Sequence, residues 1–469
     1  MSWFHTNFVL PVAEPQRYVG LSRRLGEIRK FERMPEQQQR TAQQQRLRTL
    51  LEHAYNTVPY YRKQFDDAGF HPSQARIDQP IPLPVMTRDV LRDKSDLLLS
   101  TAFKPEELKI AASSGTTSTP VTFRRDVEGL RNKVALNFQL NTWAGYEPGD
   151  SVMMLWGAHR DLTMEPSWRW RLYEEVLMHR TSAPSGLIND EILERFRLRY
   201  EKQRPKVLYG YSTVLAVFAS YLRQCGMRHK PSIVIATAEV LNEQNRKLIE
   251  SVFGIPVFVH YGSRDTGMIS AECSEHEGLH FHPWGSYVEF DRIGDTPDGP
   301  SYRILVTDLL NYGQPFIRYD TGDCVTLAIQ RCSCGRWFPL ASQILGRVAD
   351  GILLANGGIV PGVTIGCQMT SLQQNFQAIL QVQVVQKSHQ HLHLRYVVRD
   401  QSTAEFQELE SICNGIDSLI HQKMRWTLEK VSALPRERSG KIRLCLSEIE
   451  TPRSTFAAPF QAEQTLVQL

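Results

Sequence analysis

A run of eleven residues, SSGTTSTPVTF (Ser113–Phe123), is rich in small hydroxyl side chains and contains one glycine and one proline. Glycine permits a positive φ and proline removes a backbone donor, so this composition is typical of a loop. Backbone N–H groups and hydroxyls in such a loop can cradle an anion, phosphate above all. The competing interpretation is a solvated Ser/Thr linker. The run is therefore a candidate phosphate site that needs support from the rest of the chain.

A second set of residues is suited to binding a metal ion. The segments AECSEHEGLHFH (271–282) and RCSCGR (331–336) supply Cys273, a nearby histidine, Cys332 and Cys334. Three thiolates and one imidazole are a common tetrahedral ligand set for zinc. Reduced thiols are also often buried simply as small hydrophobic groups, which is the alternative. A closed four-ligand site leaves no position for a substrate, so a zinc ion here is expected to be structural.

The middle of the chain predicts the elements that position these residues. Short apolar runs occupy 151–157, 206–211, 232–237 and 255–262, each ending in glycine or polar residues. Helical patterns such as STVLAVFASYLRQCG and NEQNRKLIESVFG separate them. This alternation predicts a largely parallel sheet, with ligands bound beyond the carboxyl ends of its strands.

The flanking regions predict further units. The first hundred residues look mostly helical, with a helix over 35–58 and Thr87 placed to cap another. After TPDGPSY the strands alternate like hairpins, which favours a smaller antiparallel sheet or barrel. The pattern of the last hundred residues predicts a separate α+β unit. We therefore predict an α/β fold with two domains. A large N-terminal domain, 1–347, is helical over 1–104 and combines a mostly parallel sheet with a small β subdomain. A small mobile α+β domain, 348–469, follows it.

Composition limits the classes of partner. The 469 residues are 42% hydrophobic and 22% charged, and the net charge of +4 is spread over the chain. We therefore expect no nucleic-acid partner and no membrane insertion. MSWFHTNFVLPVAEPQ does not look like a secretory signal, so the expected location is cytoplasmic, where the eight cysteines would be thiols or metal ligands. The oligomeric state is open, with a homodimer as one option.

Six motifs, in order along the chain, resemble those of the adenylate-forming enzymes. The similar branch contains the phenylacetate–CoA ligases and related ligase-like proteins of polysaccharide gene clusters. SSGTTSTP is similar to the family's phosphate loop, ATAEVL (236–241) to its adenine-side turn and HYGSRDTG (260–267) to its Tyr-Gly-x-x-acid motif. IRYDTGD (317–323) resembles the ribose-binding turn, LGRVADG (345–351) the interdomain hinge, and LPRERSGKIR (434–443) the loop with the catalytic lysine. The likeness extends from EHAYNTVPYYRK to RSGKIR, which is most of the chain.

The resemblance implies a role for each matching residue. Lys441, Asp265 and Thr117 would be catalytic: Lys441 reaches the α-phosphate and the substrate carboxylate, and Asp265 holds Mg2+. Asp323 would bind the ribose hydroxyls and the ring of Tyr261 would lie against adenine. The remaining residues implied to bind ATP or AMP are Ser113, Ser114, Gly115, Thr116, Ala238, Glu239, His260, Gly262 and Arg347. By the pattern of the same relatives, His280 is the fourth zinc ligand, with His276 as its competitor.

Three departures from the family pattern stand out. The phosphate loop lacks a lysine after its Ser/Thr run, and Arg124 is a candidate to replace its charge. The acid after Tyr-Gly is Asp265 where glutamate is usual, one methylene shorter. At the hinge, Ala349 and Asp350 stand where two aspartates are common. These changes bear more on turnover than on nucleotide binding.

The function implied is an AMP-forming ligase that converts a small carboxylic acid and Mg·ATP to an acyl-adenylate and pyrophosphate. Coenzyme A is the default acceptor of the acyl group. An amine, an amino sugar or a carrier-protein thiol is an alternative acceptor, and a non-catalytic nucleotide-binding homologue is a rival of another class. The acid pocket is expected around 155–160, 209–214 and HYGS, where His159, Tyr211 or His260 could reach the substrate.

Overall fold

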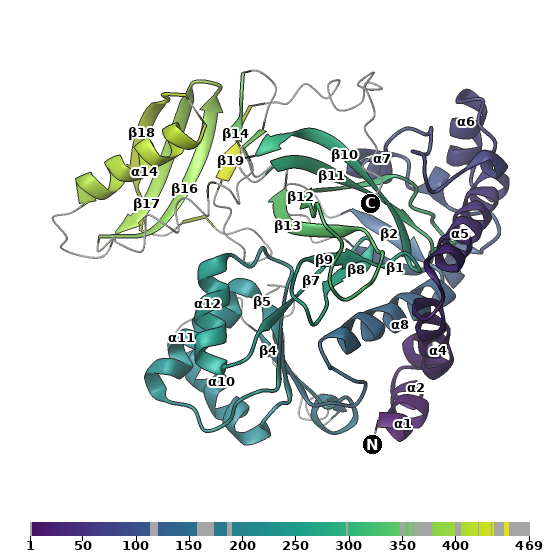
Figure 1. Ribbon diagram of the computed structural model, residues 1–469, viewed down its shortest axis with the longest axis horizontal. Helices are drawn as coiled ribbons and strands as arrows, with labels where there is room; N and C mark the ends of the chain where they lie inside the picture. Colours follow the sequence, from purple (N-terminus) through teal and green to yellow (C-terminus); the bar gives the residue numbers. More distant parts are fainter. Residues whose placement is uncertain are drawn as a thin grey trace.

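The structure, a computed structural model, describes most of the chain (Figure 1). The described residues are 2–112, 121–156, 173–184, 190–296, 299–347, 352–355, 359–360, 365, 378–398, 405–420, 422–432, 434–435 and 445–449. The predicted loop 113–117, His159, Ala349, Asp350 and Lys441 lie outside them.

The N-terminal part is helical, as predicted. Its longest helix, α5, spans Glu36–Thr57 and confirms the helix expected over 35–58. Thr87 caps α7 (Arg88–Asp93), because its Oγ1 accepts a hydrogen bond from the N–H of Val90 at 3.3 Å. The other elements before the first strand are α1 Ser2–Phe4, η1 His5–Val9, α2 Leu10–Ala13, α3 Pro15–Tyr18, α4 Leu21–Glu32, α6 Pro59–Asp67, η2 Pro72–Gln74, η3 Asp96–Leu98 and η4 Pro105–Glu107.

The predicted parallel strands form one half of a large sheet. They are β3 (Val152–Trp156), β5 (Val207–Tyr211), β6 (Ile233–Thr237) and β7 (Val257–Ser263), joined by a strand that the sequence pattern did not reveal, β4 (Arg180–Pro184). Strand order is β4-β3-β5-β6-β7, with all pairs parallel. Every residue of β5 and β6 is buried, as expected for strands covered on both faces.

Helices cover this half of the sheet. On one face lie α10 (Asp190–Gln203), α11 (Ser212–Cys225) and α12 (Glu243–Phe253), seen together at the lower left of Figure 1. Side chains such as Phe218 and Leu222 of α11 share a core with Val234 and Ala236 of β6. The long helix α8 (Val127–Trp143) packs against β8. A short π-helix, η6, spans Tyr173–Leu177.

The antiparallel strands continue the same sheet. They are β8 (Gly267–Glu272), β9 (Leu279–Phe281), β10 (Ser286–Thr296), β11 (Gly299–Asp308), β12 (Tyr319–Leu327) and β13 (Leu340–Arg347). From β7 the order is β8-β9-β13-β12-β11-β10, which completes eleven strands. The link between the parallel half and the hairpins is the short pairing of β9 with β13. A separate hairpin, β1 (Lys109–Ala112) with β2 (Thr122–Arg125), flanks the predicted phosphate loop.

The C-terminal part has a core of its own. The sheet order is β18-β17-β16-β19, with β16 Ile379–Ser388, β17 His391–Val398, β18 Arg425–Lys430 and β19 Cys445–Ser447. Helix α14 (Glu405–Leu419) packs on it through Leu409, Ile412 and Ile416, which share a core with Val384 and Leu392. Figure 1 shows this unit at the upper left. Two short strands, β14 Ile352–Leu353 and β15 Ile359–Val360, pair with each other.

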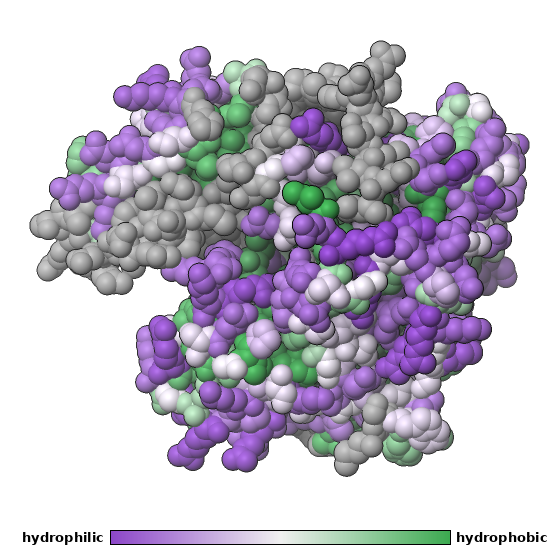
Figure 2. Space-filling model, viewed as in Figure 1, coloured by the Kyte–Doolittle hydropathy of each residue, from purple (hydrophilic) through white to green (hydrophobic). Residues whose placement is uncertain are grey.

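Within the described residues, no helix is both long and apolar enough to cross a membrane. On the face drawn in Figure 2, the described residues are mainly hydrophilic, and hydrophobic side chains show only in small groups.

Candidate functional site

Strand pairing brings the Tyr-Gly motif and the ribose-turn motif together. The hydroxyl of Tyr261, at the carboxyl end of β7, donates a hydrogen bond to Asp323 Oδ2 of β12 at 2.9 Å. Burial and the adjacent Asp323 charge raise the pKa of Tyr261 well above its ordinary value, so the hydroxyl remains a donor. Asp323 also lies opposite Arg347 in the register of β12 with β13. Tyr261 and Asp323 are thus in direct contact, and the strand register places the backbone of Arg347 opposite Asp323.

Gly262 allows the chain to turn sharply at this point. The β7–β8 pairing shifts register between Tyr261 and Gly262. A Cβ on Gly262 would lie 2.3 Å from the carbonyl oxygen of Gly267 and 2.6 Å from Met268 Cα. Only glycine fits this close approach of two backbones, which explains the residue without reference to a ligand.

Asp265 sits in the tight turn that follows, and its carboxylate is buried. Tyr319 donates to Asp265 Oδ2 at 2.7 Å, and Arg88 Nη2 lies 3.3 Å from the same oxygen. Asp265 Oδ1 is buried and has no hydrogen-bond partner within the described part of the chain. An unpaired buried carboxylate oxygen is costly, so this atom fits a site for a hard cation such as Mg2+.

Two basic side chains hold the backbone of the same turn. Arg125, at the end of β2, donates from Nη2 to the carbonyls of Arg264 and Asp265. Lys133 of α8 donates from Nζ to the Thr266 carbonyl at 2.8 Å and pairs with Asp308 at 2.5 Å. Burial lowers the pKa of Lys133 to about 8, although the charge of Asp308 opposes this shift. The strand that flanks the predicted phosphate loop is therefore tied directly to the Asp265 turn.

The adenine-side turn lies beyond β6, beside β13. Ala238 has a φ of 65°, which is unusual for a residue with a side chain. The carboxylate of Glu239 accepts hydrogen bonds from the N–H and Oγ1 of Thr213, at 3.1 and 2.6 Å. It therefore stabilises the start of α11, a structural role that sequence motifs did not indicate. A Cβ on Gly346 of β13 would lie 3.7 Å from Val240 Cγ2, so this turn approaches the hinge motif.

His260 is an unusual residue of β7. It is 2% exposed, and neither ring nitrogen has a partner among the described residues. Burial lowers its pKa to about 3, so the ring is neutral at physiological pH. The ring lies edge-on to Tyr209 of β5, with centroids 5.9 Å apart. A neutral imidazole can donate one hydrogen bond and accept another, and here both capacities are unused.

The predicted metal ligands converge into one cluster. The ligand atoms of Cys273, His280, Cys332 and Cys334 all lie within 4.8 Å of one another. Cys273 Sγ and Cys332 Sγ are 3.6 Å apart, and Cys334 Sγ is 3.4 Å from His280 Nε2. Ligands of a tetrahedral zinc ion are separated by about 3.5–3.8 Å, so the four residues fit this ion.

The structure brings His280, rather than His276, into this cluster. His280 is fully buried, and burial and the charge of Arg336 lower its pKa to about 4, which leaves it neutral as a ligand must be. His276 instead contacts Glu272, with Nδ1 3.2 Å from Oε2. Cys273 directly follows β8, whose other end begins at Gly267, next to the Asp265 turn. Five steps of about 3.3 Å separate Gly267 from Glu272, so the two ends of β8 are about 17 Å apart.

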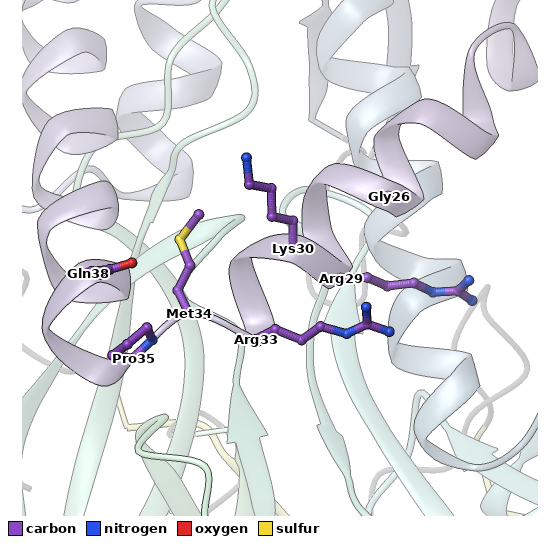
Figure 3. Close-up of a pocket in the computed structure, with 7 residues that line it drawn as sticks. All are labelled: Gly26, Arg29, Lys30, Arg33, Met34, Pro35 and Gln38. Atoms are coloured by element: carbon purple, nitrogen blue, oxygen red, sulfur yellow. The ribbon is translucent and has the colours of Figure 1, made fainter.

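An open surface pocket lies elsewhere, at the corner between α4 and α5. Gly26, Arg29, Lys30, Arg33, Met34, Pro35 and Gln38 line it, and Figure 3 shows the basic side chains extending from α4. It contains none of the predicted site residues. Arg29 is engaged there with Glu147, its Nη2 lying 3.3 Å from the carboxylate.

Comparison with known proteins agrees with the motifs. No protein-family model matches the chain. A phenylacetate–coenzyme A ligase of Thermus thermophilus is 27% identical over 349 residues, which cover 71% of this chain and 75% of that protein. The enzyme of the same name from Escherichia coli is 26% identical over 336 residues, covering 68% and 73%.

A solved structure gives the same picture for the fold. The crystal structure of a 2-hydroxyisobutyryl-CoA ligase in its postadenylation state superposes with a TM-score of 0.68. The match covers 91% of this chain and 92% of that one, at 19% identity. The chain is therefore a homologue of the phenylacetate–coenzyme A ligases and has the fold of the AMP-forming acyl ligases.

Proposed function

We propose that the chain is an AMP-forming acyl ligase that activates a small carboxylic acid as its acyl-adenylate. The observation that carries this proposal is that Tyr261 donates a hydrogen bond to Asp323, while the charges of Asp265 and Asp323 both act on Arg88, which brings the three motif residues into one region. The ligase names of its sequence relatives support the same reaction class.

Each residue of the site has its own proposed role in adenylation. Asp323 would accept hydrogen bonds from the ribose hydroxyls, and its bond from Tyr261 orients the carboxylate while the ring of Tyr261 offers a face to adenine. Asp265 would hold Mg2+ through Oδ1, the buried oxygen without a partner. When bound with ATP, that ion neutralises charge on the phosphate oxygens.

The acid carboxylate would then attack the α-phosphorus of ATP, forming a P–O bond as the bond to pyrophosphate breaks. We assign Lys441 to this step, since a cation beside the α-phosphate stabilises the charge that develops there. Ser113, Ser114, Gly115, Thr116 and Thr117 are assigned to the phosphates. The paired strands β1 and β2, on either side of this loop, support its placement beside the Asp265 turn.

The acyl group would pass to a thiol, by default that of coenzyme A, with release of AMP. Residues 348–469 are assigned to a small domain that carries Lys441 and moves between the two half-reactions. Its separate hydrophobic core, built only from residues after 350, supports this division. An amine, an amino sugar or a carrier-protein thiol is the alternative acceptor.

The acid pocket is assigned to the region around His260. A buried imidazole with two unpaired nitrogens favours an acid that bears a hydrogen-bonding group, because such a group would satisfy the ring. Tyr211 and His159 remain the other candidate contacts.

We assign a structural zinc ion to Cys273, His280, Cys332 and Cys334. All four positions of a tetrahedral ion would be filled by protein, so the ion would fasten the β8–β9 connection to the turn before β13. Metal analysis of protein purified without chelator should find about one equivalent of zinc, and less than about half an equivalent would contradict this assignment.

The experiment that tests the proposed function is pyrophosphate release from Mg·ATP across a panel of carboxylic acids, without coenzyme A. Wild-type protein should release pyrophosphate with one class of acid, and Lys441→Ala should abolish that release. ATP binding without release for any acid would favour the non-catalytic homologue. Adding coenzyme A, an amine or an amino sugar afterwards identifies the acceptor from which product is formed.

A further inference from the structure

Arg88 reaches the candidate site from a distant part of the chain. It is the first residue of α7, directly after the capping Thr87. The segment before it pairs with the start of β12: the Met86 N–H donates to the Arg318 carbonyl at 3.0 Å, and the Asp320 N–H donates to the Met86 carbonyl at 2.9 Å. Arg318 further anchors the segment by donating to the Leu83 carbonyl. These bonds fix Arg88 beside Tyr319.

The guanidinium of Arg88 joins two site residues. Its Nη2 lies 3.3 Å from Asp265 Oδ2, and its Nε donates to the Tyr319 hydroxyl at 3.3 Å. Tyr319 in turn donates to Asp265 Oδ2 at 2.7 Å. Burial and the charge of Asp265 raise the pKa of Tyr319, so its hydroxyl keeps the proton that this bond requires. The three side chains form a closed triangle of contacts.

Within this triangle, Arg88 and Tyr319 contact only one oxygen of the Asp265 carboxylate. Both donors reach Asp265 Oδ2, whereas Oδ1 is buried and has no partner among the described residues. A carboxylate that served only as a structural counter-ion would gain free energy by using both oxygens. Saturating one oxygen instead fixes the rotation of the carboxylate and keeps the other oxygen free for a ligand.

The contact between Arg88 and Asp265 joins residues that are far apart in the sequence. Arg88, on α7, lies 177 residues before Asp265 and contacts it beside Tyr319 of β12. By contrast Arg92, one turn further along α7, is exposed and pairs with its neighbours Asp89 and Asp93. The two arginines of the same helix therefore offer a matched comparison.

We propose that Arg88 is a positioning residue which, with Tyr319, holds Asp265 so that Oδ1 receives the magnesium ion of Mg·ATP. This inference rests on the assignment of Asp265 to magnesium in the proposed function. Partners behind a metal ligand orient it and raise its affinity, and their loss typically weakens metal binding by about 10–100-fold. The effect of Arg88 should therefore appear in binding of the metal and be absent from binding of metal-free nucleotide.

The test uses Mn2+ as a paramagnetic substitute for Mg2+, together with a non-hydrolysable ATP analogue and the full chain. Electron paramagnetic resonance gives the dissociation constant of Mn2+ from the protein–analogue complex, and calorimetry in EDTA gives that of the analogue alone. Neither measurement needs the carboxylic acid or turnover. The proteins compared are wild type, Arg88→Met, Arg88→Lys, Tyr319→Phe and the control Arg92→Met.

We expect Arg88→Met to weaken Mn2+ binding about tenfold or more, with analogue binding in EDTA changed less than about twofold. Arg88→Lys should recover part of the loss, because one ammonium can reach Asp265 but cannot also bridge to Tyr319 as the guanidinium fork does. Tyr319→Phe, which leaves Arg88 in place, should give a smaller loss, and Arg92→Met should match wild type.

Unchanged Mn2+ affinity in Arg88→Met and Tyr319→Phe would overturn the proposal. An equal loss of analogue binding with and without metal would overturn it in favour of direct contact between Arg88 and phosphate. If Arg88→Met does not fold, Arg88→Lys and Tyr319→Phe decide between these results. Wild-type protein that binds neither analogue nor Mn2+ would instead contradict the proposed function itself, so the two failures are distinguishable.

Discussion

The two ends of strand β8 differ in how completely their polar groups are paired. At its start, the Asp265 turn leaves one buried carboxylate oxygen without a hydrogen-bond partner among the described residues. After its end, Cys273 joins a cluster of four ligand atoms that face one another. Unpaired buried groups cost stability, whereas a complete ligand set provides it once a metal binds. The open end is thus suited to bind and release a ligand, and the closed end to hold the sheet together.

This difference predicts that substitutions at the two ends separate activity from stability. Substitutions at the open end should change nucleotide binding and turnover with little effect on folding. Substitutions at the closed end should do the opposite.

The largest effect is expected for Asp323→Ala. Losing the carboxylate that accepts from the Tyr261 hydroxyl and, in the proposed function, from two ribose hydroxyls should lower kcat/KM for ATP by about 100–1,000-fold, at about 1.5–3 kcal/mol per bond to a charged group. Initial rates of pyrophosphate release measure it. Asp291→Ala removes a half-exposed carboxylate on β10 and serves as the control. A decrease of less than about threefold would mean that Asp323 does not hold the nucleotide.

At the closed end, Cys332→Ser should remove the proposed zinc ion and lower the free energy of unfolding by about 4 kcal/mol, since loss of a metal is among the most destabilising single changes. Denaturant unfolding with metal analysis measures both quantities. Activity at low temperature should stay within about threefold of wild type, because the cluster lies at the far end of β8 from the Asp265 turn. Cys225→Ser, which changes an exposed cysteine on α11, should alter neither quantity. Loss of activity without loss of stability would contradict the predicted difference between the two ends of β8.

His260, which pairs with Ala271 near the other end of β8, predicts a pH dependence of stability. In the folded chain burial lowers its pKa to about 3, whereas the unfolded chain binds a proton near pH 6.5. Between these values the unfolded state binds more protons, so the free energy of unfolding falls as the pH falls. From pH 6.5 to 5 this single group contributes about 2 kcal/mol of loss.

His260→Leu should therefore reduce the slope of stability against pH in that interval, measured by denaturant unfolding at several pH values. His389→Gln, which changes an exposed histidine, is the control and should leave the slope unchanged. An unaltered slope in His260→Leu would show that this imidazole is paired in the native protein.

The smallest effect is expected for Tyr261→Phe. The ring is retained, and only the hydrogen bond to Asp323 is lost. We expect KM for ATP to rise about fivefold with kcat nearly unchanged, in keeping with about 1 kcal/mol for one hydrogen bond. Steady-state kinetics at saturating acid measure it. A rise as large as that of Asp323→Ala would mean that the hydroxyl, rather than the carboxylate, contacts the nucleotide directly.

Much of the fold follows from local sequence patterns. Apolar runs bounded by glycine or polar residues predicted β3, β5, β6 and β7, because strands buried on both faces must be apolar throughout. The strand β4, RTSAP, has no such pattern and was missed. The continuity of the parallel and antiparallel strands was also not foreseen, because it depends on two residue pairs between β9 and β13 that no local signal marks.

In the candidate site, too, local sequence patterns predicted some residues and missed others. Motifs located Tyr261, Asp265 and Asp323, and spacing located the cysteines of the metal cluster. Choosing His280 over His276 by geometry required the fold, because both are close to Cys273 in sequence and only the β9 pairing orients one of them inward. Arg88 could not be found at all, since its role depends on contacts across 177 residues.

The most direct test of the account follows the oxygen of the acid. The acid that supports pyrophosphate release is labelled with 18O in both carboxylate oxygens and incubated with Mg·ATP and the acceptor, and AMP is analysed by mass spectrometry. Attack of the carboxylate on the α-phosphorus transfers one labelled oxygen to AMP once the acyl group leaves. AMP heavier by about two mass units, formed by wild type and absent with Lys441→Ala, is the predicted result. Unlabelled AMP, or label recovered in inorganic phosphate, would contradict adenylation as the chemistry of this chain.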